Sequence, residues 1–322
     1  MYVVETRNLT RIYKSKHKIF GNVKEIVALD DVSFKIKEGE LFGYVGPNGA
    51  GKTTTIKILT TLLLPTSGVV RVLGHDVRKE YQEIRKQINF IFGGERGFYL
   101  RLSGKDNLKY FGDLYKIKRS VLKERINSLL ELVGLQEVAD RRVETYSRGM
   151  KQRLHIARGL INDPKVLFMD EPTIGLDPSI AKELRNMIKS LPKQGTTVFL
   201  TTHNMFEADY LCDQIAIIDK GKIKMIGTPS DLKSTVKNKT TIKIELYGSN
   251  INTVKKRELN EKFPNHTIIK ENEHKMLLSV LTSEVSQSLP TILSILDNVK
   301  ISSIQIQEAT LEDAYLQIVG CP

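Results

Sequence analysis

One short run of glycines, a lysine and threonines carries the strongest chemical signal in the sequence. It comprises Gly46, Pro47, Asn48, Gly49, Ala50, Gly51, Lys52, Thr53 and Thr54. The run matches the phosphate-loop pattern G-x-x-x-x-G-K-[ST]. Its backbone N–H groups can surround phosphate oxygens, because residues without a Cβ let the main chain come that close. We expect Lys52 to reach the β- and γ-phosphates of a nucleoside triphosphate, and Thr53 to place its hydroxyl on Mg²⁺.

The residues on either side place this run on a strand-to-helix turn. Residues 41–45 (LFGYV) are typical of a short buried strand. After the run, Ile56, Leu59 and Leu63 fall at helical spacing, and Pro65 ends that helix. Pattern and context agree, so the sequence predicts a nucleoside triphosphate site.

A second site signal is an apolar strand that ends in two carboxylates. Residues 166–171 read VLFMDE, so the strand ends at Asp170 and Glu171. Asp170 could hold Mg²⁺ beside the phosphate loop, usually through water. Glu171 could take a proton from an attacking water. Two acids after a buried strand are common, but this order along the chain is typical of phosphate-loop ATPases.

Two further features have both a functional and a structural interpretation. Ser147 and Gly149 open an amphipathic helix, where a hydroxyl and a backbone N–H can form an anion site. Alternatively, they cap a helix whose basic face is solvated. Tyr13 precedes a lysine-rich loop ahead of the phosphate loop. Its ring could stack on adenine or pack in the core.

Composition limits the classes of protein that fit. The chain has 322 residues, 40% apolar and 27% charged, which is typical of a globular protein. Its apolar runs are too short to span a membrane, and the N-terminus lacks the apolar core of a signal peptide. The net charge is +12. Residues 230–322 hold 11 basic and 11 acidic residues, so the excess lies in residues 1–229. That excess fits either nucleic acid or an anionic membrane surface.

The order of elements predicts an α/β fold followed by a smaller module. Strands alternate with helices on both sides of residues 77–160, which favours a parallel sheet covered on both faces. Residues 77–160 show helical spacing, interrupted by a glycine-rich loop at 92–97. After Pro229 the order β-α-β-β-α-β suggests a ferredoxin-like module, with a helix over 283–296 interrupted near Pro290. A final helix begins with a capping signal at Thr310 and Asp313.

Together these segments resemble the ATP-binding subunits of ABC transporters over residues 2–228. The matching motifs are the phosphate loop 46–54, the signature segment 146–150 (YSRGM), Asp170 with Glu171, the loop Gly175-Leu176-Asp177, and the switch histidine His203. The resemblance implies a P-loop NTPase fold, with a RecA-like core, an antiparallel β subdomain and a helical subdomain at about 95–160. It assigns ATP binding to residues 1–228 and leaves residues 229–322 as an accessory α+β domain.

The resemblance also implies a mechanism that uses ATP and Mg²⁺. Two copies would face head to tail, so that Ser147 and Gly149 of one close on the γ-phosphate held by Lys52 of the other. Glu171 would be the general base, and His203 would hold the γ-phosphate. Asp177 would bridge the two subunits. The structural alternatives are a strand-end cap for His203 and a turn formed with Pro178 for Asp177.

The sequence departs from the family pattern at two places. The signature usually reads Leu-Ser-Gly-Gly-Gln, whereas here Tyr146, Arg148 and Met150 replace the leucine, the first glycine and the glutamine. The family's loop glutamine should fall near Gly93 or Gly94, and Glu95 is the nearest polar substitute.

The resemblance implies the ATPase subunit of an exporter, because the ending LEDAY at 311–315 is similar to that of drug- and lipid-exporting relatives. It would lie in the cytoplasm on the inner face of the membrane, as a homodimer or heterodimer bound to integral membrane permease subunits. No nucleic-acid partner is expected. The alternatives are an ABC-type ATPase acting on ribosomes or nucleic acid, and a regulatory relative with little turnover. Cargo and transport direction stay open.

Overall fold

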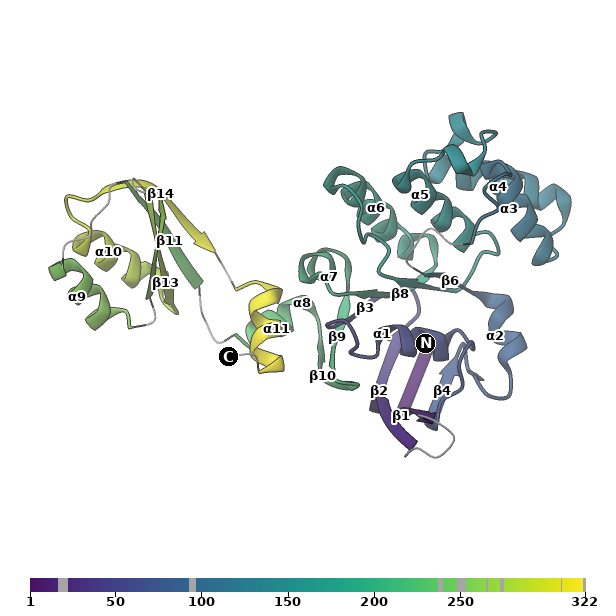
Figure 1. The fold of residues 1–322 in the computed structure, drawn as a ribbon, viewed down its shortest axis with the longest axis horizontal. Helices are drawn as coiled ribbons and strands as arrows, with labels where there is room; N and C mark the ends of the chain where they lie inside the picture. The colour runs from purple at the N-terminus through teal and green to yellow at the C-terminus, as the bar shows by residue number, and fades with distance from the viewer. Residues whose placement is uncertain are drawn as a thin grey trace. The chain divides into compact units, whose positions relative to one another are not determined.

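The computed structural model (Figure 1) describes residues 1–16, 23–92, 97–236, 240–247, 253–264, 266–272, 275–307 and 309–320. The chain divides into two compact units, Met1–Pro229 and Ser230–Pro322. Each unit has its own cluster of buried apolar side chains. The glycine-rich loop and the position expected for the family's loop glutamine fall largely on residues 93–96, which lie outside the described residues.

A six-stranded sheet forms the centre of the first unit, in the order β10-β9-β3-β8-β7-β6. Its strands are β3 (Leu41–Val45), β6 (Ile88–Phe92), β7 (Val166–Asp170), β8 (Thr197–Thr202), β9 (Gln214–Asp219) and β10 (Lys222–Gly227). The pairs among β6, β7, β8, β3 and β9 are parallel, and β10 is joined to β9 by the predicted hairpin. Strands β3 and β8 are buried throughout, as expected for a sheet covered on both faces.

A smaller antiparallel sheet, in the order β2-β1-β4-β5, packs against this one. Its strands are β1 (Tyr2–Lys16), β2 (Val23–Lys37), β4 (Ser67–Val72) and β5 (His75–Asp76). Phe34 of β2 stacks on Phe42 of β3, with ring centroids 5.5 Å apart. Phe199 of β8 lies 6.0 Å from both rings. Aromatic packing therefore joins the two sheets.

Helices cover the main sheet, and several of them lie on the side away from the antiparallel sheet (Figure 1). The helices of this unit are α1 (Lys52–Leu59), α2 (Tyr81–Gln87), α3 (Gly104–Leu114), α4 (Arg119–Leu132), α5 (Arg148–Gly159), α6 (Pro178–Ser190) and α7 (Met205–Leu211). Leu122, Ile126 and Leu129 of α4 are buried, as their spacing predicts. Ser103 caps α3 by accepting a hydrogen bond from the Asp106 N–H at 3.0 Å. The helical layer is therefore α3, α4 and α5.

One local prediction for this unit was wrong and another was incomplete. Residues 77–160 were expected to be helical apart from the glycine-rich loop, but residues 88–92 form β6 at the edge of the main sheet. A short, mostly apolar run does not reveal its own conformation, and here pairing with β7 decides it. In addition, the sequence shows strand-like pieces at 2–5 and 32–36, and both lie within longer strands, β1 and β2. The structure has a long paired hairpin because β1 and β2 bond to each other along most of their length.

The second unit has the predicted β-α-β-β-α-β order. It contains α8 (Pro229–Ser234), β11 (Thr240–Tyr247), α9 (Thr253–Lys262), β12 (His266–Asn272), β13 (Lys275–Thr282), α10 (Val285–Ile295), β14 (Lys300–Gln307) and α11 (Leu311–Val319). The antiparallel sheet has the order β12-β13-β11-β14. This arrangement is ferredoxin-like. The expected capping box at Thr310 and Asp313 begins α11.

Helix α10 continues through Pro290, although a break was predicted there. Proline lacks the N–H that would bond to the carbonyl of Ser286, four residues earlier. Both Pro290 and Ser286 are exposed. The unpaired carbonyl therefore faces water, and the buried residues Ile292 and Ile295 still pack on the sheet side.

We predict that Pro290→Ala stabilises the second unit by about 1–3 kcal/mol, because alanine restores the missing helical hydrogen bond. Urea-induced unfolding followed by circular dichroism measures the change. Pro229→Ala is the matched control, since Pro229 is the first residue of α8, where no intrahelical N–H bond is lost. An equal gain in both variants would contradict this explanation.

Candidate active site

The phosphate loop leaves β3 at Val45 and enters α1 at Lys52. Gly46 passes so close to β9 that a Cβ there would lie 2.1 Å from the carbonyl oxygen of Ile218. Gly51 has φ +109°, a left-handed conformation that favours glycine. Both glycines are therefore required by the backbone path, independently of any ligand.

Lys52 closes the loop upon itself. Its Nζ donates to the carbonyl oxygens of Gly46 at 2.7 Å and of Pro47 at 3.1 Å. The same Nζ lies 3.3 Å from Oε1 of Glu171, and the side chain is only 5% exposed. The buried cation is thus paired both with the loop and with the end of β7.

A cavity of about 160 Å³ opens over this loop. Its lining comprises Ala28, Asn48, Gly49, Gly51, Lys52, Thr53, Thr54 and Glu171. All of these except Ala28 were predicted from the sequence. Ala28 lies on β2, and no motif marks it, because the hairpin of β1 and β2 brings it to the loop. The structure therefore assembles the phosphate-loop residues and Glu171 around one cavity.

Asp170 and Thr53 bring together the oxygen atoms that a Mg²⁺ ion would need. The hydroxyl of Thr53 donates to Oδ2 of Asp170 at 2.8 Å, and Thr201 donates to Oδ1. A carboxylate and a hydroxyl are hard oxygen ligands, which fit a Mg²⁺ ion that completes its shell with water and phosphate oxygens. The described residues hold no cluster of three or more His, Cys, Asp or Glu side chains suited to a metal. The arrangement fits an ion bound together with a nucleotide.

Glu171 is held in an unusual backbone conformation. Its φ of +49° lies in the left-handed region, which costs a residue with a side chain about 1–3 kcal/mol. Its N–H donates to the carbonyl of Thr201 at 3.0 Å. Oε1 lies 3.1 Å from Nδ1 of His203 as well as 3.3 Å from Nζ of Lys52. The strained turn aims the carboxylate between a cation and an imidazole.

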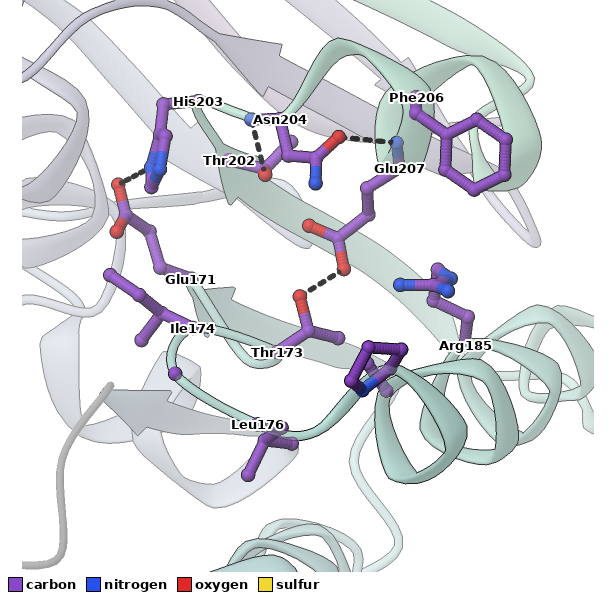
Figure 2. A pocket seen from close by; sticks show the side chains of 13 residues that line it. Glu171, Thr173, Ile174, Leu176, Arg185, Thr202, His203, Asn204, Phe206 and Glu207 are labelled. Carbon is purple, nitrogen blue, oxygen red and sulfur yellow. Dashed lines mark hydrogen bonds and ion pairs between the residues drawn. The ribbon is translucent and has the colours of Figure 1, made fainter.

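Figure 2 shows a second cavity, of about 380 Å³, beside Glu171 and His203. Thr173 donates to Oε1 of Glu207 at 2.7 Å, and Glu207 is 1% exposed. Asn204 caps α7 by accepting from the Glu207 N–H at 3.1 Å. Sequence reasoning missed Thr173 and Glu207. The spacing Asn-x-x-Glu at 204–207 resembles a helix cap, and that pattern does not reveal the contact with Thr173.

The structure separates three predicted residues from the phosphate cavity of their own chain. Ser147 caps α5 by accepting from the Met150 N–H at 3.2 Å, as its structural interpretation predicts. Gly149 packs so closely on Ile180 that a Cβ would lie 2.8 Å from it. Asp177 precedes α6, is exposed and makes no capping hydrogen bond. None of the three lines the phosphate cavity. Their part in nucleotide binding stays a prediction.

For Tyr13 and His203, the structure excludes the structural alternatives, which were core packing for Tyr13 and a strand-end cap for His203. Tyr13 lies on β1, is 36% exposed and has the Arg11 guanidinium 4.7 Å from its ring centroid, so it is no core residue. Adenine stacking by Tyr13 stays a prediction. The cap of α7 is Asn204 rather than His203. The His203 side chain contacts Glu171 and is 46% exposed. Because of this exposure, a ligand could reach its ring.

The fold and the site together define a phosphate-loop nucleotide hydrolase. A parallel sheet presents a glycine-rich loop, a lysine, two carboxylates and a histidine at the carboxyl ends of its strands, which is where such folds bind ligands. A carboxylate beside the γ-phosphate position can accept a proton from water.

Comparison with known proteins identifies the family. Residues 29–174 match the family described as "ABC transporter". The linearmycin resistance ATP-binding protein LnrL of Bacillus subtilis is 33% identical over 330 residues, covering 99% of this chain and 98% of that protein. The daunorubicin/doxorubicin resistance ATP-binding protein DrrA of Streptomyces peucetius is 32% identical over 320 residues, covering 99% and 93%. This chain belongs to the ATP-binding proteins of ABC transporters.

Solved structures agree with this assignment. A dimeric ATP-binding cassette in a post-hydrolysis state, bound to ADP and phosphate, has a TM-score of 0.62 at 27% identity. The match covers 70% of this chain and 98% of that one. The resemblance drawn from the motifs is confirmed, and so is the P-loop NTPase fold. The chain is an ATPase of this family.

The signature helix also contains a buried histidine that the motifs did not indicate. His155 of α5 is 1% exposed, and neither ring nitrogen has a hydrogen-bond partner. Its ring lies against Phe98, with centroids 4.2 Å apart. Burial, and secondly the charge of Arg158, lower the pKa of His155 from 6.5 to about 3.

We predict that His155 makes the folded state less stable in acid. The unfolded chain binds a proton below pH 6.5, whereas the folded chain resists it down to about pH 3. The contribution of neutral His155 to the free energy of unfolding is therefore fully present above pH 6.5 and is lost as the pH falls from 6.5 towards 3. The free energy of unfolding should fall by about 1 kcal/mol between pH 7.5 and pH 5.5. Urea unfolding at both pH values measures it. His155→Phe, which keeps a ring beside Phe98, should show less of this pH dependence. An unchanged dependence would exclude His155 as its source.

Proposed function

We propose that this protein is the ATP-hydrolysing subunit of an ABC exporter, dimerising on ATP to drive separate integral membrane permease subunits. The observation that carries the proposal is the convergence of Lys52, Asp170, Glu171 and His203 at one edge of the sheet. The LnrL and DrrA relatives are named as resistance ATP-binding proteins, which favours drug export over action on ribosomes. The dimeric cassette neighbour supports a dimer.

The site residues supply most of the chemistry of ATP hydrolysis. Lys52 and the N–H groups of the phosphate loop hold the β- and γ-phosphates. Glu171 takes a proton from the attacking water, whose oxygen bonds to the γ-phosphorus while the bond to ADP breaks. His203 holds the γ-phosphate in line. Thr53 and Asp170 would hold Mg²⁺, which neutralises the charge on the phosphates. Catalysis then rests on positioning and charge stabilisation.

The parts of the mechanism that cross between subunits complete the proposal. Ser147 and Gly149 would bind the γ-phosphate held by the other copy, and Asp177 would contact that copy's loop. Their exposure away from their own phosphate cavity supports this assignment for Ser147 and Asp177. Tyr13 would stack on adenine. We assign ATP binding to residues 1–228 and an accessory role to residues 229–322. The division of the chain after Pro229 supports that boundary.

We further propose a cytoplasmic location on the inner face of the membrane, through the permease subunits. No helix among the described residues is long and apolar enough to cross a bilayer. The positive charge of residues 1–229 suits the anionic inner leaflet.

Glu171→Gln should lower ATP turnover by about 10²–10⁴-fold, because an amide keeps the shape of the side chain but cannot accept the proton. ATP affinity should change little, and the ATP-bound dimer should persist. Phosphate release, nucleotide binding and light scattering measure the three properties. Glu144→Gln is the control, because Glu144 is an exposed carboxylate that pairs with Arg142 and does not line the phosphate cavity. Near-normal turnover in the Glu171 variant would remove Glu171 as the base.

Purification of the tagged protein from detergent-solubilised membranes of its own host tests the transporter assignment. A polytopic membrane protein should copurify in stoichiometric amount, and its identity would indicate the cargo class. Glu171→Gln with ATP serves as a companion sample, since it should keep the dimer closed on its partner. Copurification of ribosomes or nucleic acid in place of a membrane protein would contradict the proposal.

A further inference from the structure

Arg148 stands where the family signature carries a glycine, and its side chain contacts the loop that follows the catalytic carboxylate. Nη2 of Arg148 donates to the carbonyl oxygen of Ile174 at 3.1 Å. A Cβ on Gly175 would fall 2.3 Å from Nη2 and 2.6 Å from Cζ of Arg148. Gly175 also has φ +67°. The guanidinium therefore lies directly against the main chain of this loop, which only glycine permits.

The main chain of Ile174 connects Arg148 to Glu171. The N–H of Ile174 donates to the carbonyl oxygen of Glu171 at 3.3 Å, while the Ile174 carbonyl accepts from Arg148. The next turn bond, from the Leu176 N–H to the Thr173 carbonyl, is also 3.3 Å long. Both bonds are longer than the usual 2.9–3.0 Å, so the turn has weak support of its own. The charge-assisted bond from Arg148 is the shorter contact, and such bonds are the stronger class.

This contact is separate from those that hold the signature helix in place. Gly149 packs on Ile180 of α6, and Arg153 of α5 forms an ion pair with Glu183 of α6. These contacts reach α6 beyond the loop. Within the part of the chain that the structure describes, Arg148 is the residue of α5 whose side chain contacts Ile174 and Gly175. Its effect should therefore fall on the loop, with α5 staying in position.

We propose that Arg148 is a positioning residue: it fixes the turn from Glu171 to Ile174 and so orients the Glu171 carboxylate. Glu171 needs such support, because its left-handed backbone is strained and relaxes if the turn loosens. A glycine at position 148 could make no such bond. This role rests on the proposed function, in which Glu171 is the general base.

The test compares Arg148→Gly, which restores the family residue, with Arg148→Lys in the full chain. Arg148→Gly should lower kcat about five- to tenfold, the effect of losing one hydrogen bond of ordinary net strength from an exposed side chain, with little change in ATP affinity. Arg148→Lys keeps a donor and should recover part of kcat. Hydrogen–deuterium exchange of the peptide covering 172–177 should speed up in Arg148→Gly, a change that does not depend on turnover.

Arg153→Gln is the matched control, because it removes another cation of α5 that reaches α6 without contacting the loop. It should leave the exchange of 172–177 unchanged. Gly175→Ala completes a double-mutant cycle with Arg148→Gly. The loss of kcat caused by Gly175→Ala should be smaller in the Arg148→Gly background, because the clash with the guanidinium is absent there.

Three outcomes would overturn the role. They are unchanged exchange in Arg148→Gly, faster exchange with normal kcat, and a loss of ATP affinity at normal kcat, which would make Arg148 a nucleotide ligand instead. A wild-type chain that hydrolyses no ATP would overturn the proposed function and this role with it. Altered exchange in that case would still show that Arg148 restrains the loop.

Discussion

The rest of the site depends on the contacts of one buried cation, the ammonium group of Lys52. It is almost fully buried, and it contacts the carbonyls of Gly46 and Pro47 as well as the carboxylate of Glu171. A buried charge without partners would be strongly destabilising, so these contacts tie the phosphate loop to the end of β7. In the proposed function, a nucleotide phosphate would compete for the same ammonium. The site is thus already assembled around a cation that an anionic ligand can take over.

The parallel sheet explains why residues far apart in sequence meet at this cation. Strands β3, β7 and β8 are neighbours, and their carboxyl ends lie at one edge. The phosphate loop follows β3, Asp170 and Glu171 end or follow β7, and His203 follows β8. Stacked rings of Phe34, Phe42 and Phe199 hold the second sheet beneath them. The hairpin of that sheet supplies Ala28 to the cavity wall.

The signature residues Ser147 and Gly149 at the start of α5 lie outside the phosphate cavity of their own chain. Arg148, the first residue of α5, contacts Ile174 and Gly175. In the proposed dimer, a nucleotide held by Lys52 would meet the signature of the second copy. Arg148 and Gly175 are fitted to each other, and the loop that contains Gly175 continues to Asp177. The departure from the family signature is therefore matched by a structural contact. The second unit is a ferredoxin-like module whose core lies within its own sheet and helices.

Sequence alone determined the features that depend on local pattern. The phosphate loop, the two acids after β7, the α/β class and the order of elements in the second unit follow from residue type and short-range spacing. The tertiary structure decided what depends on contacts between distant segments. It made residues 88–92 a strand through pairing with β7, and exposed Tyr13 on a long hairpin. It also set Glu171 in a left-handed turn, joined Thr173 to Glu207, and placed Arg148 on Ile174. The physical reason is that a side chain's type and neighbours in sequence specify its local conformation, whereas its hydrogen-bond partner depends on which strands and helices pack together.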